Sequence, residues 1–279
     1  MLNALTIDLE FWWCSELLSN IEPDKENDFL EEMTGPFLDL LEKSGTKTTF
    51  FVLGQVAEKH PDLVKRIQAA GHEIASHGYS HTMIGKLGRR GFRSDLEKSM
   101  AVLKSITGER PVGYRAPSFS LNKGTAWALE TLEDMGFKYD SSIFPVSRRI
   151  VSLYGVPDAP LTPYRPAKDD ITKTAKCGIM EFPLNVYRLL GVNLPVAGGF
   201  YLRVLPLGLL KKGIRKANGE GRPAIMYVHP WEAFRDTPKR ESSLGARFRR
   251  RYGMDSVLGK LEALLKSFEF GRIREMLPE

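Results

Sequence analysis

Residues 48–77, TTFFVLGQVAEKHPDLVKRIQAAGHEIASH, decide the fold class of this 279-residue chain. The aromatic and β-branched run at 48–54 predicts a short buried strand. Residues 61–71 open with proline and close with glycine, which predicts a helix between those two positions. A second strand is expected at 72–77. Strand, helix and strand in this order predict two parallel strands joined by a helical crossover.

The same alternation continues along most of the chain. Further strands are expected at 4–9, 112–117, 137–142, 179–184 and 224–229, and further helices at 27–45, 94–108 and 122–136. The helix at 94–108 is expected to begin at a Ser-x-x-Glu capping box. Seven parallel strands favour an α/β barrel over an open sheet. No glycine-rich phosphate-binding loop follows any strand, so nothing signals a nucleotide-binding fold.

Composition and charge describe an ordinary globular protein with a mildly basic surface, since the formal net charge is +6. The basic cluster at 247–253 lacks the regular interleaving of aromatic and basic residues of an RNA-binding surface, so we expect no nucleic-acid partner. The chain has 2 cysteines, which fits a reducing compartment. Residues 1–13 resemble neither a signal peptide nor a membrane helix, so we expect a cytoplasmic protein. The apolar segment 189–210 predicts a core strand with loops, and peripheral contact with the inner membrane is its second interpretation.

Residues able to do chemistry lie at the C-terminal ends of the predicted strands, where parallel α/β folds gather their reactive groups. They are Asp8, Glu10, His77, His81, Arg115, Asp140 and His229. Residues two apart in a strand point the same way, so Asp8 and Glu10 would face one site. The two histidines of SHGYSH share a face if a helical turn follows their strand. Imidazoles with a carboxylate are a usual ligand set for hydrolytic zinc, so the sequence predicts a metal site.

Five ordered motifs resemble those of the polysaccharide deacetylase family, also called NodB homology or carbohydrate esterase family 4. They are TIDLE at 6–10, SHGYSH at 76–81, GYRAPSFS at 113–120, YDSS at 139–142 and MYVHPWE at 226–232. The resemblance implies a distorted (β/α)7 barrel with a short C-terminal helical extension. Later segments resemble an intracellular branch whose C-terminal extension occurs in exosortase-linked exopolysaccharide systems. We therefore expect a barrel at 1–240 and a helical extension packed on it at 241–279.

The resemblance also implies a role for each motif residue. The metal ligands are Glu10, His77 and His81, the catalytic residues are Asp8, Arg115, Asp140 and His229, and the substrate-binding residues are Tyr79, Ser118 and Trp231. Asp8 is the expected base, His229 the acid, Arg115 the partner of the base and Asp140 the partner of the acid. The family usually has adjacent aspartates in its first motif, whereas Leu9 separates the acids here, so the reverse assignment of Asp8 and Glu10 stays open.

The expected activity is metal-dependent removal of N-acetyl groups from the amino sugars of a polysaccharide or its oligosaccharide precursor, lipid-linked or free. The divalent metal is expected to be Zn²⁺, with Co²⁺, Ni²⁺ or Mn²⁺ as alternatives. Two other functions remain open. One is an allantoinase-like or cyclic-imide amidohydrolase of the same fold, and the other is a carbohydrate-binding protein without catalysis. The presence of all the motif acids and histidines argues against the second. The sequence does not address the oligomeric state.

Overall fold

The structure, a computed structural model, describes residues 1–14, 27–147, 155–238 and 244–278. Its central strand is β1 (Asn3–Leu9), in which every residue is buried. One edge of β1 pairs in parallel with β2 (Thr49–Val52) and the other with β9 (Ile225–Val228). Because both faces and both edges of β1 are covered, its burial is continuous and includes the polar residues Asn3, Thr6 and Asp8.

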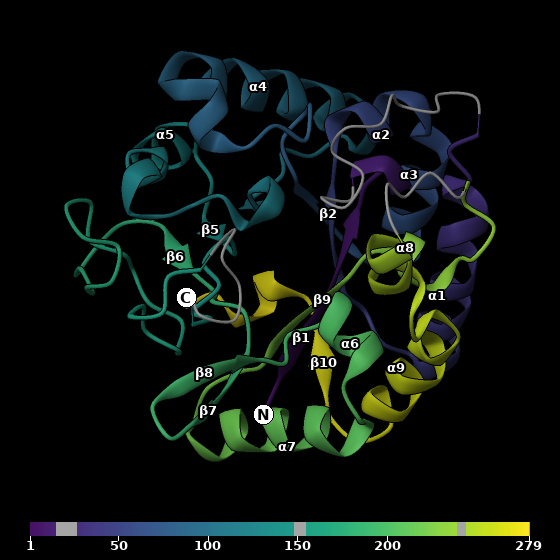
Figure 1. The fold of residues 1–279 in the computed structure, drawn as a ribbon. Helices are drawn as coiled ribbons and strands as arrows, with labels where there is room; N and C mark the ends of the chain where they lie inside the picture. The colour runs from purple at the N-terminus through teal and green to yellow at the C-terminus, as the bar shows by residue number, and fades with distance from the viewer. Residues whose placement is uncertain (15–26, 148–154, 239–243, 279) are drawn as a thin grey trace.

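From β2 the sheet continues outward through four more parallel strands. They are β3 (Glu73–Ser76), β4 (Gly113–Tyr114), β5 (Tyr139–Asp140) and β6 (Met180–Glu181). The sheet curves so that the chain after β6 reaches β9, where the backbone N–H of Asn185 donates to the Ile225 carbonyl at 3.0 Å. The seven strands expected from the sequence are all present at their expected places. The result is a parallel half-barrel with helices around it, which confirms the expected distorted (β/α) barrel (Figure 1).

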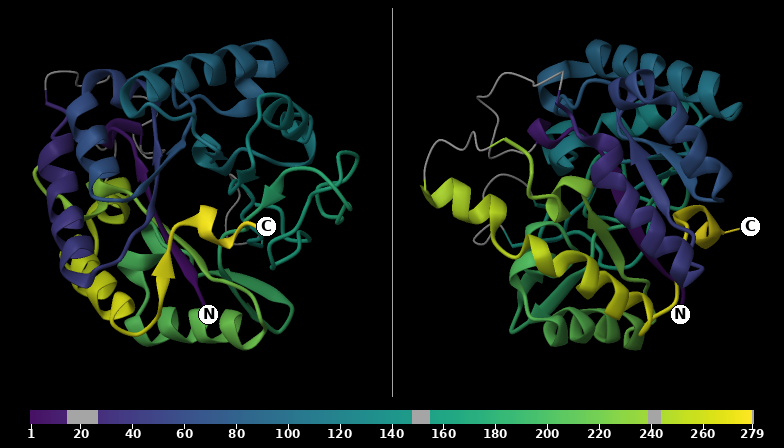
Figure 2. Two further views of the ribbon diagram at one scale, coloured as in Figure 1. Left: turned by 180° about the vertical axis from the view of Figure 1, so that it is seen from behind. Right: turned by 90° about the vertical axis from the view of Figure 1, so that its right-hand side faces the viewer.

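Helices cover the outside of the strands in every view (Figures 1 and 2). They are α1 (Leu30–Ser44), α2 (Gly54–Lys59), α3 (Pro61–Ala69), α4 (Ile84–Thr107), α5 (Ala128–Asp134), α6 (Phe200–Val204), α7 (Leu207–Gly219), α8 (Leu244–Arg251) and α9 (Val257–Leu265). α1 ends at Gly45, whose left-handed backbone closes the helix as the sequence indicated. The expected start of the fourth helix at Ser94 is wrong. α4 begins at Ile84 and continues through a kink at Gly88, so Ser94 lies inside it.

The segment 189–210 contains parts of four elements rather than one core strand. β7 (Val186–Leu189) and β8 (Val192–Pro195) make an antiparallel hairpin, and α6 and the start of α7 follow. The hairpin tip is exposed, since Leu190 is 95% exposed. Among the described residues, no helix combines the length and the apolar character needed to cross a membrane.

The C-terminal tail is helical in α8 and α9, as expected, but it then returns to the sheet. β10 (Phe270–Gly271) pairs in parallel with the first residues of β1, with Asn3 opposite Phe270. Figure 1 shows this yellow strand beside the purple β1 at the centre of the molecule. The tail therefore contributes to the central sheet, while the domain boundary at residue 240 stays a prediction.

Candidate metal centre and catalytic site

Three expected metal ligands converge at the C-terminal ends of β1 and β3. Glu10 follows β1 by one residue, and His77 follows β3 by one residue. Candidate ligand atoms of Glu10, His77 and His81 all lie within 4.8 Å of one another. The Nε2 atoms of His77 and His81 lie 3.5 and 2.7 Å from Oε2 of Glu10. Two imidazoles and one carboxylate around one point match the ligand set of hydrolytic zinc sites.

Asp95 of α4 holds the turn between His77 and His81 by hydrogen bonds to its backbone. Its carboxylate accepts the backbone N–H of Tyr79 at 2.7 Å and that of Ser80 at 3.2 Å. Gly78 has a φ of +76°, and a Cβ there would lie 2.9 Å from the same carboxylate. His81 itself has a φ of 53°, a conformation that costs energy for a residue with a side chain. Such strain is typical of functional loops, and here it places the His77 and His81 rings on the same side of the turn.

The tautomer of His77 follows from its second nitrogen. Nδ1 lies 2.9 Å from the Arg115 carbonyl, which can only accept, so Nδ1 carries the proton. Nε2 is then left with its lone pair directed towards Glu10. Burial opposes ionisation of Glu10, but the neighbouring His81 and His229 hold the pKa of this carboxyl well below its usual range. An ionised carboxylate and a correctly oriented imidazole are what a divalent cation requires, so these residues fit the metal that the family resemblance implies.

Asp8 lies beside this triad and is held by a buried arginine. Nη1 of Arg115 donates to Oδ1 of Asp8 at 2.7 Å and to the Thr6 hydroxyl at 2.6 Å. Nε and Nη2 of the same guanidinium donate to the carbonyl and hydroxyl of Ser141 at 2.9 and 2.8 Å. Arg115 is fully buried, and Asp8 is nearly so. Four directed hydrogen bonds fix this guanidinium, which in turn fixes one oxygen of Asp8 and leaves the other facing the site.

His229 lies opposite, within reach of both acids of the first motif. Its Nε2 is 3.7 Å from Oε1 of Glu10 and 4.0 Å from Oδ2 of Asp8. Its Nδ1 lies 3.2 Å from Oε2 of Glu232. Burial opposes protonation of His229, but the Glu10, Glu232 and Asp8 carboxylates raise its pKa to about 9. The side chain can therefore hold a proton at Nε2 and point it into the site.

The carboxylate partner of His229 was not found by sequence reasoning. Glu232 is buried, and its Oε1 accepts from Nε of Arg203 at 3.1 Å. Arg203, on α6, also donates to the Tyr252 carbonyl at 3.2 Å and to the carbonyl of Arg250, both at the end of α8. A chain of contacts thus links the C-terminal tail to the imidazole. The available signal was the acid three residues after the histidine in HPWE, a spacing that suits a helical turn.

Asp140 does not orient His229, and that expectation is wrong. Its carboxylate accepts from the Ser142 hydroxyl, and it faces Glu181 in the interior. Burial raises the pKa of both Asp140 and Glu181. Asp140 is the last residue of β5, and its side chain is paired within that part of the sheet, whereas Nδ1 of His229 contacts Glu232.

Two of the three expected substrate-binding side chains have other partners. Trp231 is only 7% exposed, stacks on the His229 ring and donates from Nε1 to Oε1 of Glu10 at 3.1 Å. The buried ring thus contacts two other site residues. The Tyr79 hydroxyl donates to Glu58 of α2 at 2.6 Å, and Lys98 lies 3.6 Å from its ring centroid. The substrate-binding roles of Trp231 and Tyr79 stay predictions.

Ser118 lies in the turn that follows Arg115, and its φ is 53°. Phe119 is also left-handed, with a φ of 46°. Two consecutive strained residues next to a buried arginine again mark a loop under functional constraint. The role of the backbone N–H near Ser118 stays a prediction.

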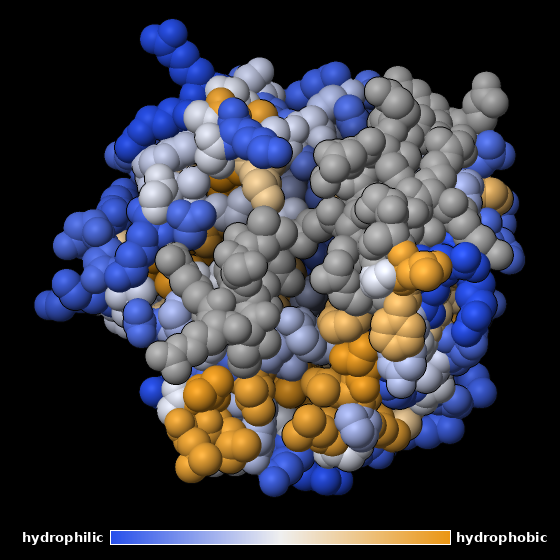
Figure 3. All heavy atoms as spheres, viewed as in Figure 1, coloured by the Kyte–Doolittle hydropathy of each residue, from blue (hydrophilic) through white to orange (hydrophobic). Residues whose placement is uncertain are grey.

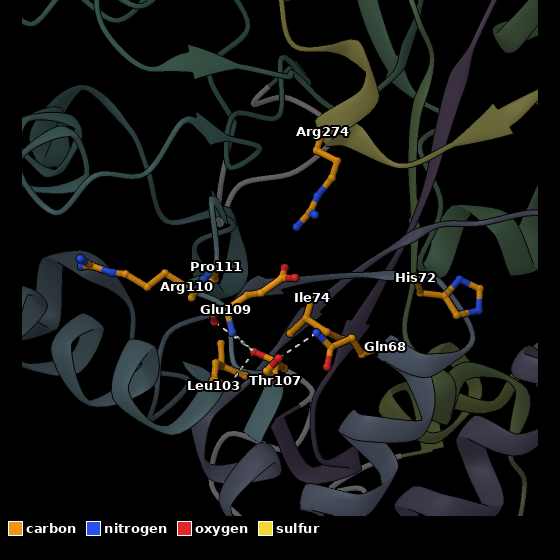
Figure 4. A pocket seen from close by; sticks show the side chains of 9 residues that line it. All are labelled: Gln68, His72, Ile74, Leu103, Thr107, Glu109, Arg110, Pro111 and Arg274. Carbon is orange, nitrogen blue, oxygen red and sulfur yellow. Dashed lines mark hydrogen bonds between the residues drawn. The ribbon is translucent and has the colours of Figure 1, made fainter. Parts of the chain in front are cut away.

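A small polar cavity of about 30 Å³ lies at the opposite, N-terminal ends of the strands, and it has room for about one ordered water. Gln68, His72 and Glu109 are among its lining residues, and Gln68 donates to the Thr107 carbonyl at 3.0 Å (Figure 4). None of the expected site residues lines it, so it is separate from the metal centre.

Two sequence families together match most of the chain. Residues 24–139 match the polysaccharide deacetylase family, and residues 141–278 match a domain of unknown function named DUF3473. Residues 24–139 of this chain are thus a polysaccharide deacetylase domain, and a DUF3473 domain follows it. The first match contains both metal-ligand histidines and Arg115, whereas His229, Glu232 and Arg203 lie in the DUF3473 region. The site is therefore built from both matched regions and from β1. Its place in an intracellular, exosortase-linked branch stays a prediction.

Similar proteins extend these matches. The peptidoglycan-N-acetylglucosamine deacetylase of Bacillus cereus is 38% identical over 100 residues, which is 36% of this chain and 36% of that protein. The chain therefore spans about a third of the length of this curated relative. A putative polysaccharide deacetylase from Mycobacterium smegmatis has a similar solved structure, with a TM-score of 0.57, 20% identity and coverage of 98% and 89% of the two chains. The Puue allantoinase structure is similar too, with a TM-score of 0.58, 17% identity and coverage of 96% and 85%. At such identities the structural likeness shows the fold alone.

Proposed function

We propose that this protein is a metal-dependent hydrolase that removes N-acetyl groups from the amino sugars of a glycan. The observation that carries the proposal is the convergence of a two-histidine, one-carboxylate centre with a second acid and a further histidine. Asp8 and His229 both lie beside Glu10, and Nε2 of His229 is 4.0 Å from Oδ2 of Asp8. Hydrolysis of an amide needs a base for water and an acid for the departing amine. In this proposal Asp8 is the base and His229 is the acid.

Glu10, His77 and His81 would hold the divalent metal, proposed to be Zn²⁺ because imidazole nitrogen and carboxylate oxygen suit it. When bound, such a metal polarises the acetyl carbonyl and lowers the pKa of water. The remaining steps belong to the protein's own side chains.

Asp8 accepts the proton of the attacking water through Oδ2, because Oδ1 is already occupied by Arg115. The guanidinium fixes the direction of the carboxylate. His229 carries a proton on Nε2 and donates it to the leaving amine, so that the C–N bond breaks to give a neutral amine. Glu232 holds the imidazole through Nδ1. A backbone N–H near Ser118 would stabilise the negative oxygen of the tetrahedral species.

Acetate release from N-acetylglucosamine oligomers tests the proposal, measured with and without a chelator. A small ureide such as allantoin is assayed in parallel, because the allantoinase-like alternative shares this fold. We expect acetate release that the chelator abolishes and no ureide hydrolysis. Hydrolysis of the ureide alone would overturn the proposal in favour of the alternative, and glycan binding without acetate release would indicate a non-catalytic protein.

The substrate is proposed to be a polymer or an oligosaccharide rather than a single sugar. The name of the Bacillus cereus relative indicates peptidoglycan N-acetylglucosamine, which supports an acetylated amino-sugar glycan as the class. A lipid-linked oligosaccharide precursor belongs to the same class and presents the same acetamido group.

A further inference from the structure

Exposed large hydrophobic side chains are concentrated on two elements of the described structure. Apart from Met1, they are Leu189, Leu190 and Val192 at the β7–β8 hairpin tip, and Leu244, Phe248 and Tyr252 on and just after α8. We refer to these six residues as the apolar face. Figure 3 shows hydrophobic atoms gathered over the hairpin, over α6 and beside α8 on one side of the molecule. The right-hand view of Figure 2 agrees, since the hairpin and α8 project from that same side.

The α8 part of this face has the spacing of an amphipathic helix. Leu244, Phe248 and Tyr252 are four residues apart and so form one stripe. Leu244 is 84% exposed and Phe248 is 61% exposed. The opposite side of the helix is anchored, because Arg250 is buried and lies over the Trp12 ring at 5.3 Å. The stripe therefore faces outward from a fixed helix.

The charges of the elements that carry this face have one sign. Residues 182–219 and 244–254 contain ten of the 40 Lys and Arg residues and none of the 34 acidic residues. The rest of the chain then has 30 basic and 34 acidic residues, so its own balance is negative. Arg188 beside the hairpin tip and Arg247 on α8 are exposed. Of the ten cations, Arg203 and Arg250 are buried, and the exposed acids that border the two ranges, Glu220 and Asp255, are paired with Lys216 and Arg235. An apolar face with this remaining excess of cations matches a surface that is both apolar and anionic.

A second copy of the chain fits this face poorly. In a symmetric dimer the same patch meets itself, so the cations of both copies would be brought together. A bilayer containing anionic lipids offers the complementary charge and an apolar interior in one surface. We propose that the apolar face docks this protein on the surface of an anionic lipid bilayer.

Docking there would place the membrane close to the catalytic histidine. The carbonyls of Arg250 and Tyr252 at the end of α8 hold Arg203, which holds Glu232, which holds His229. The docking helix is thus a structural support of the site. Vesicle binding needs no turnover, so the inference is tested separately from the proposed deacetylation.

The test is co-sedimentation of the full chain with vesicles. One set contains equal parts of phosphatidylglycerol and phosphatidylcholine, and the other contains phosphatidylcholine alone. We expect binding to the anionic vesicles that weakens as salt is added, and at least about tenfold weaker binding to the neutral ones.

Two variants test the apolar contribution. Phe248→Ser and Leu190→Asn each remove an exposed side chain, and asparagine tolerates the left-handed φ of 48° at position 190. Each should weaken binding about tenfold, since burying such a side chain contributes about 1.5–3 kcal/mol. Arg247→Gln should weaken binding about fivefold, at about 1 kcal/mol for a cation near an anionic surface.

The matched control is Arg93→Gln on α4, which removes an exposed arginine paired with Asp134 and should bind like the wild type. Thermal melts check that every variant is folded. Three results would overturn the inference. They are no sedimentation with anionic vesicles, binding by the Phe248 and Leu190 variants that equals wild-type binding, and a dimer in solution that these substitutions dissociate.

Discussion

Glu232→Gln tests whether the buried acid next to His229 positions that imidazole for catalysis. The substitution keeps the shape of the side chain and removes its charge, so Arg203 loses its carboxylate partner at 3.1 Å. Removing one partner of a buried ion pair costs about 3–5 kcal/mol. We expect about 3 kcal/mol, because the Tyr252 and Arg250 carbonyls still accept from the guanidinium.

The catalytic cost is separate from this loss of stability. An amide at position 232 holds Nδ1 of His229 less strongly and stabilises its protonated form less. General acid catalysis is worth about 10²–10⁴-fold, so weakening it should lower kcat by about 10–100-fold. KM should change little, since Glu232 is buried behind the imidazole. Zinc content should not change.

The double variant Glu232→Gln with Arg203→Met separates the two effects. Removing both charges leaves no unpaired charge in the interior. The free energy of unfolding should therefore recover a large part of the lost amount, about 3 kcal/mol, as is usual when both partners of a buried ion pair are replaced. The low kcat should remain. Kinetics of acetate release and urea denaturation are measured on the same preparations, with the exposed Glu130→Gln as a control. The reasoning is refuted if Glu232→Gln keeps the wild-type kcat, or if the double variant regains kcat along with stability.

Three further predictions follow from buried groups. Asp8→Asn should lower kcat by about 10²–10⁴-fold and keep zinc, whereas Glu10→Gln should lose zinc, as measured by elemental analysis after dialysis. Gly78→Ala should lower stability by at least about 1 kcal/mol in urea denaturation, because a side chain at a φ of +76° is strained and would lie 2.9 Å from Asp95. Burial lowers the pKa of His72 from 6.5 to about 4, and its Nδ1 accepts a backbone N–H. The folded protein holds His72 in its neutral form. The contribution of His72 to the free energy of unfolding is therefore complete above pH 6.5 and is lost as the pH falls towards 4. About 1.3 kcal/mol should disappear between about pH 7.5 and 5.5, and His72→Gln should lack this part of the loss.

Each of these has a contrary outcome. Zinc lost from Asp8→Asn and kept by Glu10→Gln would reverse the assignment of the two acids. An unchanged stability of Gly78→Ala would show that the turn adjusts freely. The same acid sensitivity in His72→Gln as in the wild type would assign the loss to other groups.

The strand ends, and a metal site near the two acids and the histidine pair, could be predicted from general rules of parallel folds, whereas the choice of Glu10 as the ligand came from the family resemblance. Parallel strands place their C-terminal ends at one edge, and residues two apart in a strand share a face. These rules bring Asp8 and Glu10 towards the histidine pair without any knowledge of the turns. The motif order then supports one site rather than scattered polar residues.

The features that the sequence did not predict depend on side-chain direction and on packing between distant parts of the chain. Asp140 and Glu232 both follow strand ends, and only the turn geometry shows that Glu232 reaches His229. The capping pattern at Ser94 was overridden because the helix had already begun at Ile84. β10 has two residues, and its pairing with β1 crosses nearly the whole chain, so no local pattern could indicate it. Trp231 shows the same limit, since its indole turns inward to Glu10.

The most direct test is the zinc content of the purified protein after dialysis, compared between the wild type and His77→Ala. If Glu10, His77 and His81 hold one cation that hydrolysis requires, the wild type retains one zinc per chain and releases acetate, and His77→Ala does neither. Wild-type turnover by His77→Ala without bound metal would contradict the account.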